Sequence, residues 1–324
     1  MAVDETARSS MLRSVADIAS PDDSPSSPLE QTPPGEALEW AIRAVGGSRV
    51  VSVEPLRGGK SHANRLLRID ESGAIHEVVL RRWARADWHE TDPEFSPAQE
   101  AATYGLLASS EVPAPRLLAA DIAGRECDVP ALLLTRAPGT QLTRPADMRS
   151  FLTQLAGALP IMHGVDPDRA SRTLPPYRPY YEHEQLGAPA WTRRPSVWER
   201  AIETATGPRP TEPFAFIHRD YHPGNTLWVA GTLAAIVDWT TASWGPPAVD
   251  LAHMRANLAM SFGIDTAAEF LDAYRAIAGA PSAFDPYWDV RVAVDLLPDL
   301  PVGNRSVAEL KRLDDFVADS VARL

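Results

Sequence analysis

The sequence predicts an α+β protein of two lobes, in which a β-sheet with one inserted helix precedes a larger and mainly helical part. The chain has 324 residues, which is long enough for a two-lobed enzyme or two ordinary domains. Strand-like segments separated by glycine turns dominate the first part, and helical apolar spacing dominates after Gly139. We therefore expect a leader at residues 1–35, an N-terminal lobe at residues 36–138 and a C-terminal lobe at residues 139–324.

The bulk composition limits the environment and the partners of the protein. Residues 1–35 are dense in proline, serine and aspartate and should be mostly disordered, because they cannot bury enough apolar surface to offset ordering. No secretory signal and no run of the ~18 apolar residues of a membrane helix is found, and Cys127 is the only cysteine. These features favour a cytoplasmic location without membrane contact. The formal net charge of −12 argues against nucleic acid as a partner.

The N-terminal lobe is expected to begin with a helix that Gly46-Gly47 ends. After it, alternating apolar residues and glycine turns predict strands on both sides of one helix whose first residue is proline. The strands are expected at Arg49–Leu56, Asn64–Ile69, Ile75–Trp83, Arg116–Asp121 and Ala131–Thr135, and the helix at Pro97–Ser109.

The C-terminal lobe is expected to be mainly helical, with a small β element at its centre. Apolar spacing and alanine, leucine and glutamate content predict helices at residues 145–165, 192–206, 247–262, 265–279 and 305–323. Short apolar segments predict strands at Phe214–Ile217 and Leu233–Val237, with Asn225–Val229 as a partner.

The candidate chemistry lies around this β element. A buried strand leads into His218-Arg219-Asp220, Asn225 follows five residues after Asp220, and Asp238 ends the next apolar strand. Phosphoryl transfer needs one carboxylate that orients the attacking hydroxyl and oxygen ligands that hold Mg²⁺ against the phosphates. Asp220 suits the first role as the catalytic residue, and Asn225 and Asp238 suit the second as metal ligands.

The same stretch resembles a known superfamily. His218 to Asn225 is similar to the H-R-D-x-x-x-x-N catalytic loop of the protein-kinase-like superfamily. Together with Ile-Val-Asp-Trp ending at Trp239 and Gly-Pro-Pro-x-x-Asp-Leu-Ala at residues 245–252, it resembles the aminoglycoside phosphotransferase and choline kinase branch. Weaker similarity extends over residues 40–280. The resemblance implies a protein-kinase-like fold, an ATP or GTP donor with Mg²⁺, and a small-molecule acceptor hydroxyl such as that of an aminoglycoside-type antibiotic.

The resemblance also implies a phosphate-binding cation in the first lobe. Arg81 stands where the branch usually carries lysine, and Glu100 on the following helix would pair with it. Arg82 is adjacent and points to the opposite strand face, so the sequence leaves open which arginine faces the phosphates. Gly59 and Ser61 lie in a glycine-containing loop between two strands, where backbone N–H groups could cover phosphates.

The adenine of the nucleotide is expected at the junction between the lobes. The segment Leu132–Gly139 resembles the inter-lobe hinge of the branch, where the adenine edge would meet the Thr135 carbonyl and the Ala137 N–H. Asp250 is expected to brace the catalytic loop, and His163 to contribute packing.

Several alternatives remain open from the sequence alone. His218, Asp220 and His222 alternate, as the metal ligands of a hydrolase on one strand face would. The arginine at position 81 also suits an inactive nucleotide-binding protein of the same fold, and a choline, homoserine or sugar kinase has the same motifs. Four acids could meet an amine-bearing acceptor or be surface helix residues; they are Asp285, Asp289, Asp295 and Asp299. The sequence does not decide the oligomeric state.

Overall fold

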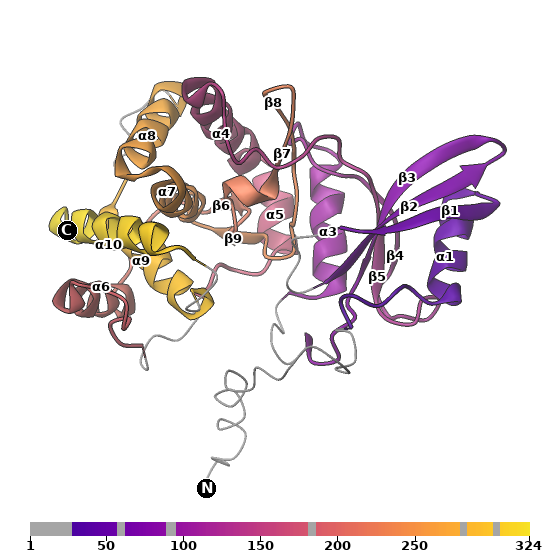
Figure 1. The fold of residues 1–324 in the computed structure, drawn as a ribbon, viewed down its shortest axis with the longest axis horizontal. Coiled ribbons are helices and arrows are strands. Elements are labelled where there is room, and N and C mark those ends of the chain that lie inside the picture. Colours follow the sequence, from indigo (N-terminus) through magenta and orange to yellow (C-terminus); the bar gives the residue numbers. More distant parts are fainter. Residues whose placement is uncertain (1–27, 57–61, 89–94, 181–185, 279–283, 301–304) are drawn as a thin grey trace, which may run out of the picture.

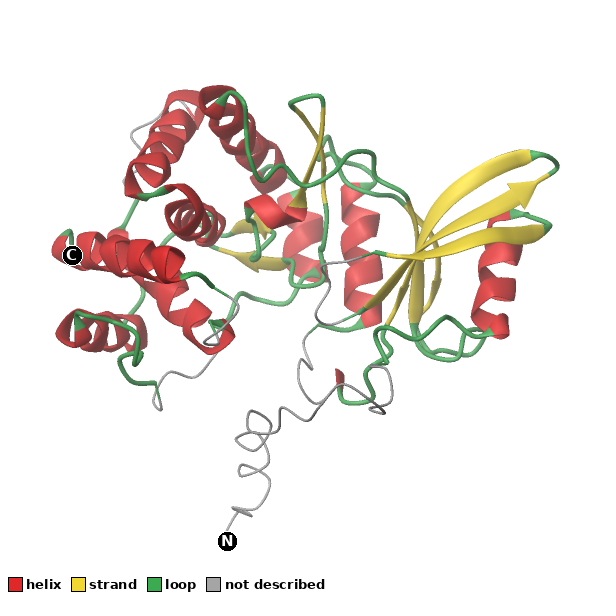
Figure 2. Cartoon of the chain, viewed as in Figure 1, coloured by secondary structure: helices red, strands yellow, loops and turns green. Residues whose placement is uncertain are grey.

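The structure is a computed structural model of the chain. It describes residues 28–56, 62–88, 95–180, 186–278, 284–300 and 305–324 (Figure 1). A five-stranded sheet with two helices forms one part of the molecule, and a bundle of helices with two small sheets forms the other (Figures 1 and 2). The expected α+β arrangement is therefore present. No helix among the described residues is long and apolar enough to cross a membrane.

The five-stranded sheet is antiparallel throughout, with the spatial order β1-β2-β3-β5-β4. Its strands are β1 (Arg49–Pro55), β2 (Ala63–Glu71), β3 (Ala74–Arg82), β4 (Leu117–Asp121) and β5 (Ala131–Thr135). A tight turn at Ser72-Gly73 joins β2 to β3, and both turn residues have positive φ. Side chains alternate across β3: Val78 and Leu80 pack against α1 and β2, whereas Val79 faces the helical part.

Two helices flank this sheet. α1 (Gly35–Val45) ends at Gly46, whose φ of 71° is left-handed, and its Trp40 enters the core under the sheet. α3 (Pro97–Leu107) begins with Ser96 as N-cap and Pro97 in its first turn. In Figure 1, α3 stands between the sheet and the helical part, so side chains on it can reach both.

The helical part surrounds α7, which is buried on most of its faces. Its helices are α4 (Met148–His163), α5 (Pro167–Thr173), α6 (Pro195–Thr206), α7 (Ala248–Phe262), α8 (Ile264–Ala278), α9 (Pro286–Leu296) and α10 (Val307–Ala322). One two-stranded sheet pairs β6 (Ala215–Ile217) with β9 (Ser243–Gly245), and the other pairs β7 (Thr226–Val229) with β8 (Thr232–Ile236).

Most predicted elements are confirmed within a few residues, but α5, α9 and β9 were not predicted. α9 carries charged residues at buried positions, which breaks the apolar spacing of a core helix. The lobe boundaries and the disordered leader remain predictions, because residues 1–27 lie outside the described part. Within that part, Arg65 on β2 donates hydrogen bonds of 2.9 Å to the carbonyls of Leu29 and Gln31, so the chain contacts the sheet before residue 36.

Candidate active site

The loop after β6 is held by one buried carboxylate. Asp250, in the first turn of α7, accepts the His218 N–H at 3.0 Å and the Arg219 N–H at 2.7 Å. His163 at the end of α4 contacts the same carboxylate at 3.0 Å. Arg219 has a positive φ of 70°, so the chain turns sharply there and presents Asp220. Asp250 thus lies where a brace of the loop was expected, and His163 contributes a polar contact to it.

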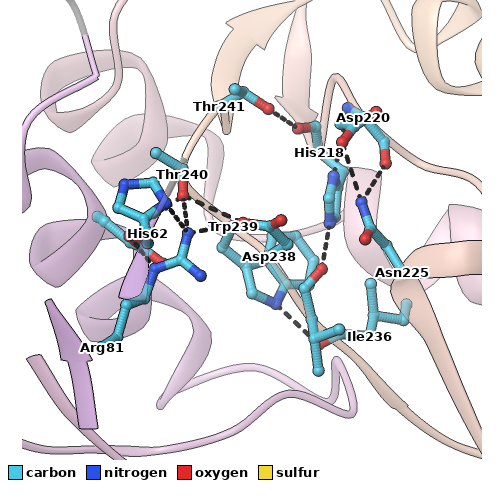
Figure 3. Close-up of polar contacts among 12 residues, drawn as sticks. His62, Arg81, His218, Asp220, Asn225, Ile236, Asp238, Trp239, Thr240 and Thr241 are labelled. Carbon is cyan, nitrogen blue, oxygen red and sulfur yellow. Dashed lines mark hydrogen bonds and ion pairs between the residues drawn. The ribbon is translucent and has the colours of Figure 1, made fainter. Parts of the chain in front are cut away.

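Both nitrogens of the His218 ring form hydrogen bonds within the protein. Its Nε2 donates to the Val237 carbonyl at 3.0 Å, and its Nδ1 accepts the Asp220 N–H at 3.3 Å (Figure 3). The ring also packs on Trp239, with centroids 4.5 Å apart. Neither ring nitrogen is available to a metal. Across the described ranges, moreover, no group of three or more His, Cys, Asp or Glu could hold one. The hydrolase alternative built on His218, Asp220 and His222 therefore lacks its site.

The Asp220 carboxylate is held through both oxygens. Oδ2 accepts Nδ2 of Asn225 at 3.0 Å, and Oδ1 lies 3.1 Å from Nε2 of His253. The side chain keeps 34% of its surface exposed, so a substrate can still reach it. Burial opposes the negative charge, but His222 and His253 outweigh burial and hold the pKa of Asp220 well below its usual value. Asp220 is therefore an oriented carboxylate that can accept a hydrogen bond from a hydroxyl.

Asn225 and Asp238 are brought together by the β7–β8 hairpin. Asn225 ends a short 3₁₀ turn, and its carbonyl accepts the Val237 N–H at 2.9 Å, one residue before Asp238. Asp238 has a positive φ of 65° and a side chain that is 40% exposed. Asn225 Oδ1 and Asp238 Oδ2 accept no hydrogen bond from any other described residue. Amide and carboxylate oxygens are the ligands that Mg²⁺ prefers, so this pair fits that ion.

Arg81 faces this pair from the sheet. It lies on the side of β3 that faces the helical part, donating from Nε to Glu100 at 3.0 Å and from Nη2 to Asp238 at 2.7 Å. In Figure 3, Asp238 lies between Arg81 and the pair formed by Asp220 and Asn225. Arg82 points to the opposite face, where it pairs with Asp128. Of the two adjacent arginines, Arg81 is therefore the one that faces Asp238.

The charges around Arg81 influence one another strongly. Burial disfavours the guanidinium, but Glu100 and Asp238 outweigh it and raise the pKa of Arg81 further. Glu100 is fully buried on α3, and burial raises its pKa to about 7 although Arg81 opposes the rise. Thr240 was not predicted; its Oγ1 lies 3.2 Å from both Glu100 Oε2 and Asp238 Oδ1. Together these residues link α3, β3 and the loop after β8.

The His62 ring also contacts this cluster. Its Nδ1 lies 3.0 Å from Nη2 of Arg81, and since the guanidinium can only donate, Nδ1 must be the acceptor. Burial, and then the charges of Arg81 and Arg85, hold the pKa of His62 well below its usual 6.5.

This environment predicts an acid-sensitive contribution to stability. The folded protein resists protonation of His62 while the unfolded chain does not, so stability is full above pH 6.5 and is lost as pH falls below it. We expect the melting temperature of His62→Asn, which retains an acceptor but cannot titrate, to fall less on mild acidification than that of the unmodified protein. Parallel pH curves from thermal unfolding would contradict this prediction.

The structure describes only some of the other residues that were predicted to bind the nucleotide. Gly59 and Ser61 lie outside the described residues. Thr135 ends β5, and Ala137 follows it in a segment without helix or strand structure. Gly139 has a φ of 94°, and a side chain there would collide with the Trp228 carbonyl at 2.5 Å. Thr140 then pairs with Trp228 on β7, so the segment after β5 is fixed to the hairpin that carries Asn225.

The four acids proposed for the acceptor have mostly structural partners. Asp289 is fully buried and paired with Arg255 at 2.9 Å and with Arg323 at 3.0 Å. Asp295 is buried against Arg291 at 2.9 Å. Asp285 caps α9, and the side chain of Asp299 is outside the described part. For Asp289 and Asp295, the expectation of surface helix acids was wrong, because both form buried ion pairs.

The fold and the site together define a phosphotransferase that acts on small molecules. The chain belongs to the phosphotransferase enzyme family, which it matches over residues 52–287. The expected membership is confirmed, and it supports an enzyme that transfers phosphate to a small-molecule hydroxyl. A search of curated protein sequences finds no significant match.

Solved structures share the fold at low sequence identity. The aminoglycoside phosphotransferase APH(4)-Ia, solved as a thermostable mutant with AMP-PNP and hygromycin B, has 19% identity and a TM-score of 0.59, over 88% of this chain and 98% of that chain. The macrolide 2′-phosphotransferase MphH from Brachybacterium faecium has 21% identity and a TM-score of 0.55, over 86% of this chain and 96% of that chain. The predicted kinase-like fold class is confirmed.

Proposed function

We propose that the protein transfers the γ-phosphate of ATP or GTP, with Mg²⁺, to a hydroxyl group of a small molecule. The observation that supports this most strongly is the convergence of three groups of oxygens and one cation. The carboxylate of Asp220, the amide oxygen of Asn225 and the carboxylate of Asp238 lie on two linked loops, and Arg81 meets Asp238 from the sheet. Phosphoryl transfer requires little more than such positioning and charge neutralisation.

Each residue has a distinct part in this proposal. Asp220 accepts a hydrogen bond from the acceptor hydroxyl, orients it for in-line attack and takes its proton. Asn225 and Asp238 would hold Mg²⁺, which when bound neutralises phosphate charge. Arg81, positioned by Glu100, binds phosphate oxygens through its planar fork.

The rest of the nucleotide is assigned to the loop and the hinge. Gly59 and Ser61 would cover the phosphates with backbone N–H groups. The Thr135 carbonyl and the Ala137 N–H would meet the adenine edge. Structures of APH(4)-Ia with AMP-PNP or ADP support a nucleoside triphosphate donor.

For the acceptor, we propose an aminoglycoside-type antibiotic. APH(4)-Ia was solved with hygromycin B, and this supports the choice. A kinase acting on choline, homoserine or a sugar is the alternative. It gains weight because Asp289 and Asp295, two of the acids considered for an amine-bearing acceptor, are already neutralised by arginines. We propose a cytoplasmic location, where the nucleotide is available.

The test is phosphate transfer from γ-labelled ATP and GTP, with Mg²⁺, to a panel of aminoglycosides, macrolides, choline, homoserine and sugars. We expect one acceptor class to be labelled, and labelling to stop when Mg²⁺ is chelated and return when it is added back. The Asp220→Ala variant should bind AMP-PNP but label nothing. Binding of neither nucleotide, or equal labelling by Asp220→Ala, would refute the proposal.

A further inference from the structure

His253 contacts the carboxylate of Asp220 from α7. It lies on α7, 6% exposed, with Nε2 at 3.1 Å from Oδ1 of Asp220. Burial opposes a charge on this ring, but the Asp220 carboxylate outweighs burial and raises the pKa of His253. The protonated ring then forms a buried ion pair with Asp220.

His222 reaches the same oxygen but in a different state. Its Nδ1 accepts the Gly224 N–H at 3.0 Å, so this ring is neutral with its proton on Nε2. Nε2 lies 3.7 Å from Oδ1 of Asp220, which is longer than a hydrogen bond. The two rings stack at 5.8 Å. Only His253 is thus within hydrogen-bond distance of the carboxylate.

We propose that His253 is a positioning residue for phosphoryl transfer, holding Oδ1 of Asp220 as an imidazolium while Asn225 holds Oδ2, so that the carboxylate plane is fixed toward the acceptor hydroxyl. This rests on the proposed role of Asp220. Each carboxylate oxygen has a further lone pair, so Asp220 can still accept the hydroxyl. The ion pair makes Asp220 a weak base, which suits a reaction that gains most from orientation.

α7 can position Asp220 because two of its residues contact the loop after β6. Asp250 and His253 are three residues apart and share one face of the helix. Asp250 fixes the backbone at His218 and Arg219, and His253 fixes the side chain of the next residue. The charged groups that influence His253 are Asp220, bonded to it, and Asp250, both of which favour the imidazolium.

The kinetic test compares His253→Leu and His253→Gln with Asn257→Leu, a matched control. Asn257 lies one turn further along α7, and its side chain donates to the His253 carbonyl at 2.9 Å. With the acceptor labelled in the panel, we expect His253→Leu to lose about 100-fold in kcat, because misplacing a catalytic group costs this much. His253→Gln keeps one hydrogen-bond donor, so its kcat should be about tenfold higher than that of His253→Leu. The KM for nucleotide and the AMP-PNP affinity should stay within about twofold in all three variants, and Asn257→Leu should keep its kcat.

A second measurement does not depend on the acceptor. The ¹⁵N spectrum of the imidazole rings near neutral pH, assigned by comparison with His253→Gln, should show two protonated nitrogens for His253. An unprotonated nitrogen would overturn the ion pair, and an unchanged kcat in His253→Leu would overturn the positioning role. Failure of the proposed function would instead appear in the unmodified protein, as absent transfer to every acceptor.

Discussion

Asp220→Asn is expected to lower kcat by about 10²–10⁴-fold, the usual contribution of a positioned general base. The reason is specific to this carboxylate, whose two oxygens both accept hydrogen bonds, one from Asn225 and one from His253. An asparagine at this position has one acceptor oxygen and one donor group. One of the two neighbours must then meet a donor, so the variant loses both the proton acceptor and the orientation of the side chain.

The measurement is steady-state kinetics on the labelled acceptor together with AMP-PNP binding by calorimetry. Nucleotide affinity should change by no more than a few-fold, because Asp220 is not among the groups expected to bind phosphate or metal. Asp272→Asn is a suitable control, since Asp272 is an exposed residue of α8 that forms an ion pair with Arg275 in the next turn. A kcat within tenfold of the unmodified value would remove Asp220 from its role.

Much of the fold follows from local patterns. A short, continuous apolar run defines β5 to the residue, and Ser96-Pro97 and Gly46 mark helix ends because capping is a local property of the chain. α9 was missed for the same reason. Its Asp289 is neutralised by Arg255 on α7 and by Arg323 at the end of α10, and such a partner is distant in sequence. A buried charge then resembles an exposed one until the fold supplies its partner.

The same distinction applies to the site: some of its residues could be predicted from local sequence, and others depend on contacts between residues distant in sequence. Asp220, Asn225 and Asp238 stand at fixed spacings on one hairpin region, so a motif could identify them together. His253 and Thr240 have no such signal, because His253 acts through a contact 33 positions from its partner and Thr240 through one with α3. Which of Arg81 and Arg82 faces Asp238 likewise depends on the packing of β3 against α3, since alternation only places the two arginines on opposite faces.

Arg81→Met should destabilise the folded protein by about 3–5 kcal/mol, the usual cost of leaving one buried charge of an ion pair without its partner. Glu100 is fully buried, and its Oε1 has no hydrogen-bond partner among the described residues. Its remaining polar contacts converge on Oε2, from Arg81 and Thr240. Removing Arg81 therefore leaves a carboxylate that must be protonated or hydrated, and either costs stability.

The double variant Arg81→Met/Glu100→Gln distinguishes structure from phosphate binding. Neither charge of the Arg81–Glu100 pair is left in this variant. We therefore expect it to recover most of the lost free energy of unfolding, measured by urea denaturation, since replacing both partners of a buried pair is often nearly neutral. Affinity for AMP-PNP should remain low in the single and the double variant, because the cation that we propose to bind phosphate is absent from both. If the double variant regained nucleotide affinity along with stability, Arg81 would act only through the fold, and the cation facing the phosphates would have to be sought elsewhere.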